Sequence, residues 1–193
     1  MRLFHAQYAC STAPYILINE LGLACDIVNT NMADRAELKK FNPQGKVPTL
    51  VLDNGQTLTE CAVIMQYLAD QKPEANILPR VGTWERYKTL EATNYVATEL
   101  HKSLGALFSP TITPEAKTFA KQTAEQKLSY LNTTLGNQQF MACNQFTIAD
   151  IYCFVVVGWT KVLGFDMSQY PNILGYCERI GARPSIVKAY SSN

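Results

Sequence analysis

The sequence predicts an α/β amino-terminal domain with a mixed four-stranded sheet, followed by an all-α carboxy-terminal domain. Two patterns carry this prediction: a strand–helix–strand run over residues 2–29 and a strand–strand–helix run over residues 49–69. The third observation is that no convincing strand follows Trp84. A βαβ unit makes its two strands parallel, whereas a hairpin makes its strands antiparallel. We therefore expect a βαβ–ββα domain over residues 1–78 and a helical domain over residues 85–193.

The first strand–helix–strand unit has clear signals at its ends. Arg2–Phe4 is the first strand candidate, and a helix is expected over Thr12–Leu21, with Ser11 as a candidate N-cap. Gly22 should end this helix, because glycine readily adopts the left-handed conformation found after helices. The second strand is expected over Cys25–Asn29.

The rest of the amino-terminal domain alternates turn signals with short apolar runs. Residues 31–40 are polar and allow a short helix, and Asn42–Pro48 is dense in turn formers. After that segment we expect, in order, a strand, a hairpin turn, a return strand and a helix, over Thr49–Leu52, Asp53–Gly55, Thr57–Leu58 and Glu60–Ala69.

The spacing of apolar residues predicts that the carboxy-terminal domain consists of helices. A long helix is predicted over Arg86–Phe108, and its apolar face is assigned to Leu90, Ala97, Leu100, Leu104 and Leu107. The other expected elements are a helix from Thr113 to about Leu135, a helix opened by a Thr147/Asp150 capping box, a helix over Ile173–Ile180 and a last short turn at Pro184.

The composition narrows the classes of function. Of the 193 residues, 47% are hydrophobic and 17% charged, and the net charge is +1. A protein that binds nucleic acid through phosphate contacts carries a basic excess, so no nucleic-acid partner is expected. The longest apolar run, Ile151–Trp159, has nine residues and is too short to span a bilayer. Without a signal-peptide pattern, we expect a soluble cytoplasmic protein that has no membrane partner.

Six cysteines are scattered singly along the chain, at positions 10, 25, 61, 143, 153 and 177. None forms a CxxC pair, and no Cys/His cluster has the spacing of a zinc site. The sequence therefore predicts no metal, and mostly buried free thiols in a reducing compartment.

Five motifs stand in order along nearly the whole chain: Ala9–Ser11, Asn42–Pro48, Thr59–Asp70, Asn94–Lys102 and Phe146–Asp150. Together with the order of the elements, they resemble the cytosolic glutathione transferases, and most closely the bacterial beta class. The resemblance implies a thioredoxin-like amino-terminal domain that binds glutathione, an electrophile site contributed by the helical domain near His101, and a homodimer. Individual motifs are weak signals, but together they are specific for the family.

Cys10 lies at a strand-to-helix junction. The backbone N–H groups and the positive end of the helix dipole should lower the pKa of its thiol. Position 13 is alanine, so Cys10 has no nearby resolving cysteine in the sequence and could form only a mixed disulfide with a small thiol. The alternative is a small buried side chain without chemistry. The resemblance favours the first interpretation, because beta-class enzymes have a cysteine beside the glutathione sulfur.

Ser11, the Val47-Pro48 bond and Arg35 are further candidates for the predicted glutathione site. Ser11 could donate its proton to the glutathione thiolate, or it could simply cap the helix. The resemblance implies a cis bond at Val47-Pro48, where the main chain of Val47 pairs with the cysteinyl unit of glutathione. It also implies a basic residue for the glycyl carboxylate, for which Arg35 is the candidate.

Glu60 and Cys61 open the helix after the fourth strand. A helix N-terminus suits the γ-glutamyl carboxylate, and the Glu60 side chain suits the ammonium group. Alternatively, Glu60 only complements the helix dipole. The family often has serine where this chain has Cys61, which we interpret as a structural thiol rather than a second nucleophile. A further departure is His5, where the family tends to have tyrosine.

Asn94 and His101 lie seven residues apart on the long predicted helix and project within about 40° of Leu90. This pattern alone favours a hydrogen-bonded core histidine. The resemblance instead implies that His101 faces the sulfur and that Asn94 belongs to the glutathione site. Lys102 would neutralise the glycyl carboxylate, or is a surface lysine.

These observations predict a glutathione transferase, with glutathione as co-substrate and a small hydrophobic electrophile as the second substrate. The thiolate would attack the electrophile, and Cys10 would also perform thiol–disulfide exchange. Two alternatives stay open. One is a non-catalytic binding or regulatory module of the same fold, and the other is a thiol-dependent isomerase or dehalogenase.

Overall fold

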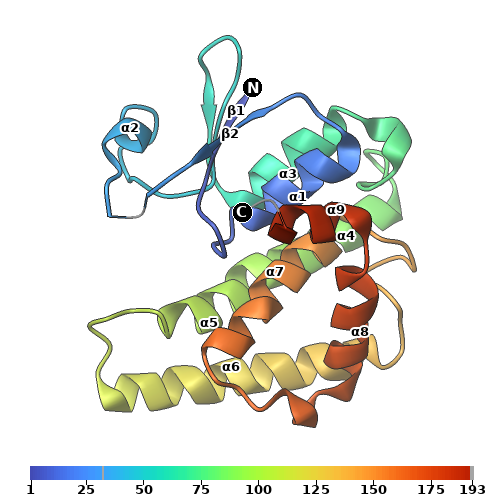
Figure 1. Cartoon of the computed structure of the whole chain (residues 1–193). Coiled ribbons are helices and arrows are strands. Elements are labelled where there is room, and N and C mark those ends of the chain that lie inside the picture. Colours follow the sequence, from blue (N-terminus) through green and yellow to red (C-terminus); the bar gives the residue numbers. More distant parts are fainter. Residues whose placement is uncertain (32, 192–193) are drawn as a thin grey trace. The chain divides into compact units, whose positions relative to one another are not determined.

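The computed structural model describes residues 1–31 and 33–191 and divides the chain into two compact units (Figure 1). The amino-terminal unit comprises Met1–Leu78 and the segment that begins at Arg183, and the helical unit comprises Pro79–Ala182. Residues 183–191, which the sequence analysis placed in a helical domain over residues 85–193, pack against the first helix of the amino-terminal unit.

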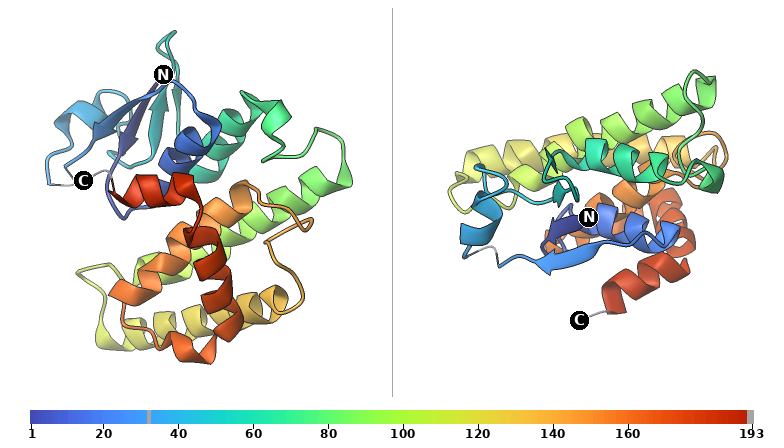
Figure 2. Two further views of the ribbon diagram at one scale, coloured as in Figure 1. Left: turned by 45° about the vertical axis from the view of Figure 1, so that its right-hand side comes forward. Right: turned by 90° about the horizontal axis from the view of Figure 1, so that it is seen from above.

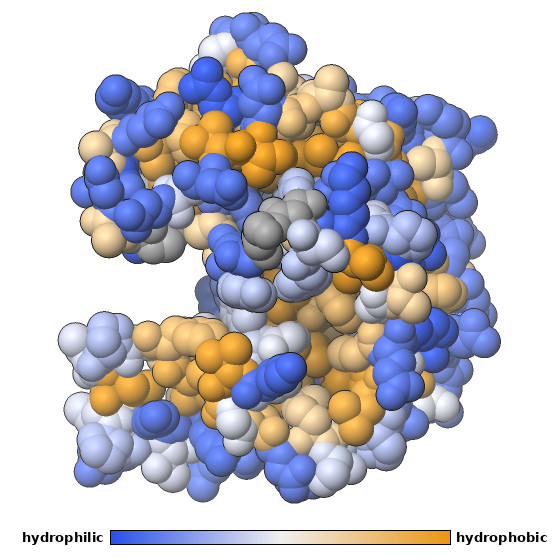
Figure 3. Space-filling view, viewed as in Figure 1, coloured by the Kyte–Doolittle hydropathy of each residue, from blue (hydrophilic) through white to orange (hydrophobic). Residues whose placement is uncertain are grey.

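The predicted mixed sheet of four strands is confirmed. Its strands are β1 (Arg2–His5), β2 (Asp26–Asn29), β3 (Thr49–Val51) and β4 (Thr57–Leu58), in the order β2-β1-β3-β4. β1 pairs parallel with β2 and antiparallel with β3, so Leu3 lies between Ile27 and Leu50. β3 and β4 form the predicted hairpin, whose exposed tip is hydrophilic (Figure 3).

Helices cover both faces of this sheet. α1 (Thr12–Leu21) and α3 (Cys61–Asp70) lie together on one side, and the short α2 (Ala36–Lys39) lies on the other (Figure 1). Alternation along a strand sends successive side chains to opposite faces, and Phe4 accordingly packs with Leu38 of α2. The apolar residues of the amino-terminal unit that are 0% exposed are Leu3, Ala13, Ile16, Leu17, Leu50, Ile64, Met65 and Leu68. Burying each large apolar side chain stabilises the fold by roughly 1.5–3 kcal/mol.

The last helix of the described residues is α9 (Pro184–Ser191), where only a short turn was expected from the sequence. The Glu20 carboxylate of α1 accepts hydrogen bonds from Arg183 and from the Ser185 hydroxyl. Ile186 is buried, so the segment has both a polar tether and an apolar face. Proline at the first position is compatible with a short helical turn and with a longer helix. Packing against α1 stabilises the longer helix that the structure has.

The helical unit contains α4 (Trp84–Tyr95), α5 (His101–Ala106), α6 (Pro114–Leu135), α7 (Ile148–Val162) and α8 (Pro171–Gly181), and Figure 2 shows them from two sides. α7 packs against α4 and α8, and α6 packs against α5 and α8. The predicted capping interaction is present, because the Asp150 carboxylate accepts hydrogen bonds from the N–H (2.8 Å) and the hydroxyl (3.0 Å) of Thr147. No helix in the described part of the chain is long and apolar enough to cross a membrane.

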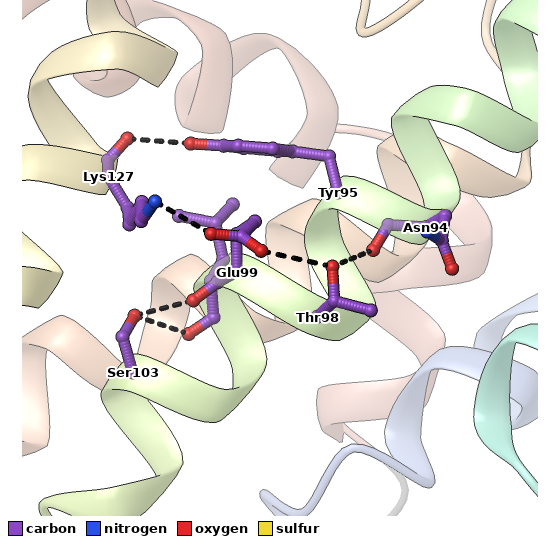
Figure 4. Close-up of polar contacts among 7 residues, drawn as sticks. Asn94, Tyr95, Thr98, Glu99, Ser103 and Lys127 are labelled. Atoms are coloured by element: carbon purple, nitrogen blue, oxygen red, sulfur yellow. Dashed lines mark hydrogen bonds and ion pairs between the residues drawn. The ribbon is translucent and has the colours of Figure 1, made fainter.

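The long predicted helix is not uniform. A π-helical turn, Val96–Leu100, separates α4 from α5. Figure 4 shows the contacts at this turn: Tyr95, the last residue of α4, donates to the Lys127 carbonyl at 3.0 Å, and the Lys127 ammonium pairs with Glu99 of the turn at 2.7 Å. The wider π turn changes the angle between residues before and after it. As a result, the expected apolar face is wrong in its first half, where Leu90 and Ala97 are only half-buried and Thr89, Thr93 and Val96 face the core.

Candidate functional site

Cys10 is the residue immediately before Ser11 and α1, in the loop that leaves β1. Its thiol donates a hydrogen bond to the carbonyl oxygen of Val47, with 3.6 Å between sulfur and oxygen. The Val47-Pro48 peptide bond is cis, as predicted. The fold therefore brings together a thiol at the start of a helix and the main chain of an irregular turn 37 residues further along the chain.

The turn that carries Val47 is held by side-chain hydrogen bonds. The Asn42 amide donates to the Lys46 carbonyl at 3.1 Å and to the Thr49 hydroxyl at 3.0 Å. The Arg35 guanidinium donates to the Gly45 carbonyl at 2.9 Å. The predicted basic residue Arg35 is thus placed beside this turn, and at least one of its N–H groups holds the turn itself.

The Cys10 thiol is more acidic than an ordinary cysteine. The hydrogen bond from the Cys61 thiol is the main cause that lowers the pKa of Cys10, and the backbone N–H groups of Cys10 and Ser11 act in the same direction. Burial and the negative charge of Glu60 oppose this shift. The predicted direction is therefore correct, but the sequence analysis missed the largest cause.

Cys61 is the first residue of α3 and is 6% exposed. Its thiol donates a hydrogen bond to the carbonyl oxygen of Cys10 at 3.5 Å. The signal that could have suggested this pair is that both cysteines stand at the start of helices that cover the same face of a small sheet. Sequence spacing alone gave no reason to join residues 51 positions apart.

Glu60 occupies the N-cap position of α3 with a left-handed backbone, at φ 66° and ψ 117°. A positive φ is uncommon for a residue other than glycine and costs of order 1–3 kcal/mol, and such conformations cluster at functional sites. The Glu60 side chain is exposed, and the first N–H groups of α3 follow it. The N-terminal end of α3 and a carboxylate thus adjoin the two cysteines.

Ser11 does not cap α1, which corrects that alternative. Its backbone is already helical, at φ −62° and ψ −13°, and its side chain makes no capping hydrogen bond. Instead the buried hydroxyl donates to the Ala6 carbonyl at 3.1 Å and accepts from the Ala6 N–H at 3.0 Å. It also shares a hydrogen bond of 3.1 Å with Nδ1 of His5, whose pKa is lowered by burial. The single proton of Ser11 therefore organises the loop before Cys10.

His101 begins α5, directly after the π turn of the helical unit, and is half-buried. Its Nδ1 and the hydroxyl of the buried Tyr152 share a hydrogen bond of 2.6 Å. The Trp159 ring packs edge-on against His101, 4.9 Å between centroids, and Phe108 packs edge-on against Trp159 at 5.7 Å. Phe108 is 48% exposed, and apolar patches lie among polar ones on the surface of the helical unit (Figure 3). Tyr152 and Trp159, both on α7, are partners of His101 that the sequence did not reveal.

The other two predicted residues of the helical unit, Asn94 and Lys102, are exposed. The π turn lies between Asn94 and His101, so the spacing argument that set them on one face does not hold. The Asn94 carbonyl accepts a hydrogen bond from the Thr98 hydroxyl at 3.0 Å (Figure 4). Among the described residues, no group of three or more His, Cys, Asp or Glu side chains could hold a metal ion.

Comparison with known proteins gives consistent results over both units. The family model described as the glutathione S-transferase N-terminal domain matches residues 3–76, and the one described as the glutathione S-transferase C-terminal domain matches residues 98–193. The chain is 36% identical to glutathione S-transferase GstA of Escherichia coli O157:H7, over 100% of this chain and 98% of that protein.

Solved structures agree with this. A bacterial beta-class glutathione S-transferase of Sphingomonas chungbukensis is 42% identical, with a TM-score of 0.96 over 100% of this chain and 98% of the other. A sphingomonad glutathione S-transferase, solved in complex with glutathione, is 37% identical, with a TM-score of 0.96 and the same coverage.

Proposed function

The chain belongs to the glutathione S-transferase family, and we propose that it binds glutathione along the Val47 turn with the glutathione sulfur beside the Cys10 thiol. The observation that carries this proposal is the 3.6 Å hydrogen bond from Cys10 to the Val47 carbonyl. It sets a thiol with a lowered pKa next to the main-chain groups with which an extended peptide can pair. The complex of the sphingomonad relative with glutathione supports the same ligand.

The α3 N-terminus and Glu60 take the γ-glutamyl end of the peptide in this proposal. The positive N-terminal end of α3 attracts the α-carboxylate, and the exposed Glu60 carboxylate attracts the ammonium group. The left-handed backbone of Glu60 turns the chain sharply into the helix, so that both groups arise from adjacent residues. Arg35, beside the same turn as Val47, is proposed for the glycyl carboxylate.

Two reactions follow from this arrangement. In conjugation, the glutathione thiolate attacks a small hydrophobic electrophile and displaces a leaving group or adds to the electrophile. In disulfide exchange, the Cys10 thiolate attacks the sulfur of a glutathione disulfide, and one glutathione leaves as a thiolate. We propose that Cys10 and the helix N–H groups stabilise the thiolate in the first reaction and that Cys10 is the nucleophile in the second.

The helical unit contributes His101 in this proposal, with the apolar surface around Phe108 suited to a hydrophobic electrophile. Asn94, Lys102 and Ser11 remain proposed members of the site. The Ser11 proton would have to leave the Ala6 carbonyl before it could reach a thiolate. We also propose a homodimer in the cytoplasm, where the six free cysteines of the structure would stay reduced.

The test compares the wild-type protein with Cys10→Ala in two assays: conjugation of glutathione to an aromatic halide and reduction of a mixed disulfide by glutathione. We expect Cys10→Ala to lose the second activity and to retain part of the first. Cys25→Ala is the matched control, because Cys25 is a half-buried thiol of the same unit whose sulfur donates a hydrogen bond to the Asp26 carbonyl at 3.7 Å. Equal disulfide reduction by Cys10→Ala and wild type would refute the role of Cys10. Retained glutathione binding without turnover in either assay would favour the non-catalytic module.

A further inference from the structure

Cys61 stands in an unusual place for a purely structural thiol. It is fixed at the first position of α3, and its hydrogen bond to the Cys10 carbonyl ties the start of α3 to the loop before α1. The Cys61 side chain is also a hydrogen-bond donor to the Cys10 thiolate and lowers the pKa of Cys10, so the one Cys61 proton serves either the Cys10 carbonyl or the Cys10 sulfur. α1 and α3 pack side by side, so this contact joins two rigid elements of one unit.

We propose that Cys61 is the resolving thiol of Cys10, and that it attacks the mixed disulfide between Cys10 and glutathione to close a Cys10–Cys61 disulfide. This inference rests on the proposed disulfide exchange at Cys10. It revises the interpretation of Cys61 as an inert structural thiol and supplies the resolving cysteine that position 13, an alanine, lacks.

The exchange balances in two steps. The Cys10 thiolate first attacks glutathione disulfide, whose S–S bond breaks, and one glutathione leaves as a thiolate. The Cys61 sulfur then attacks the Cys10 sulfur, the bond to the second glutathione breaks, and that glutathione leaves as a thiolate that takes up the Cys61 proton. In sum, one glutathione disulfide and two protein thiols give one protein disulfide and two glutathione molecules.

Burial sets the order of these steps. Cys61 is 6% exposed, so a bulky disulfide reaches the more accessible Cys10 first, and Cys61 meets the sulfur only after the adduct has formed. Reaction at Cys10 is further favoured by the direction of its pKa shift. The closed disulfide removes the Cys10 thiolate until another glutathione reopens it.

The helical unit offers an internal contrast. Cys153 and Cys177 are also close enough to interact, but burial raises the pKa of both, to about 12 for Cys177. Cys153 is completely buried. Cys153 and Cys177 are close together, but neither is an acidic, accessible thiol. We therefore expect both to stay reduced when the protein is exposed to glutathione disulfide.

Two substitutions separate the covalent role of Cys61 from its hydrogen bond. Cys61→Ser keeps a donor for the Cys10 sulfur but cannot form a disulfide. Cys61→Ala removes both, so the pH at which Cys10 is half-alkylated should rise in Cys61→Ala more than in Cys61→Ser.

The experiment exposes the full-length protein to glutathione disulfide, stops the reaction with an alkylating reagent in denaturant, and reads the products by intact mass and peptide mapping. In the wild type we expect a Cys10–Cys61 disulfide, no lasting glutathione adduct, and alkylated Cys153 and Cys177. In Cys61→Ser the glutathione adduct should accumulate on Cys10. Cys25→Ser is the control and should behave as the wild type.

A stable adduct on Cys10 in the wild type, equal to that in Cys61→Ser, would overturn the resolving role and leave disulfide exchange at Cys10 intact. If Cys10 stays alkylated and unmodified in every variant, both the exchange and its resolution are refuted, whereas conjugation activity would still stand. A disulfide between Cys153 and Cys177 instead would also contradict the proposal. It would show that the closeness of two cysteines, and not the acidity and accessibility of one of them, determines which disulfide forms.

Discussion

The sulfur of Cys10 lies 3.6 Å from the carbonyl oxygen of Val47, to which it donates a hydrogen bond. Cys10 supplies the acidic thiol from the connection between β1 and α1, and Val47 supplies the main chain before a cis-proline from the connection between α2 and β3. A peptide that pairs with Val47 therefore brings its own side chain to Cys10. For glutathione, that side chain is the thiol.

The cysteines should differ in the pH at which they react. Cys10 should be alkylated at a lower pH than Cys25, because the pKa of Cys10 is lowered by hydrogen bonds, whereas burial raises that of Cys25. The measurement is the alkylation rate of each cysteine against pH, followed by peptide mapping. Cys153, fully buried, should react only on unfolding. Identical profiles for Cys10 and Cys25 would remove the physical basis for a special thiol.

Substitutions at His101 and Tyr152 test whether the helical unit takes part in conjugation. Replacement of His101 by Gln should lower kcat/KM for conjugation by about tenfold or more if the imidazole stabilises the reacting groups. Tyr152→Phe removes the 2.6 Å hydrogen bond to Nδ1 and should cost about 1 kcal/mol of unfolding free energy, while shifting the pH profile of conjugation. Tyr130→Phe, at an exposed tyrosine of α6, is the control and should change neither. An unaltered pH profile in Tyr152→Phe would show that this pair is structural only.

Asp150 should make stability depend on pH. Burial raises the pKa of Asp150 to about 6, although hydrogen bonds from Met141, Thr147 and Tyr176 oppose the shift. Between about pH 4 and 6 the folded protein thus holds a proton that the unfolded chain has released, so this contribution to stability is lost as the pH rises. The loss is on the order of 2–3 kcal/mol.

The measurement is the unfolding free energy of wild type and Asp150→Asn in urea across that pH range. Asparagine does not titrate, so the advantage of the wild type over the variant should shrink as the pH rises from about 4 to 6. If it grows instead, the carboxylate is stabilised in its charged form and the burial argument is wrong.

Glu20 should hold the carboxy-terminal helix. Glu20→Gln weakens the bonds to Arg183 and Ser185 and should lower the unfolding free energy by about 1–2 kcal/mol, with faster amide exchange in α9. Glu37→Gln is the matched control, since Glu37 pairs with Arg2 at 3.8 Å between exposed side chains and should cost less than about 0.5 kcal/mol. Equal exchange in α9 for both variants would contradict the tether.

Local signals in the sequence were enough to predict the sheet. Alternating apolar runs and turn residues placed the four strands, and Gly22 does end α1 in the left-handed conformation. Thr113 and the Thr147/Asp150 pair correctly marked two helix starts. These features depend on residues that are neighbours in the chain.

Features that depend on distant contacts were missed. The π turn at Val96–Leu100 has no local signature and is accompanied by bonds to Lys127 from another helix. The packing of α9 on α1 was not predicted from the sequence, because Glu20 and Arg183 lie more than 160 residues apart. The same applies to Cys61: the resemblance identified its position, but only the fold revealed its contact with Cys10.

The most direct test of the account is a crystal structure of the protein grown with saturating glutathione. The account predicts that the cysteinyl main chain of glutathione pairs with the N–H and carbonyl of Val47, with its sulfur in contact with the Cys10 sulfur and its γ-glutamyl end at Glu60 and the start of α3. Glutathione bound elsewhere, or no ligand along the Val47 turn at saturation, would contradict it.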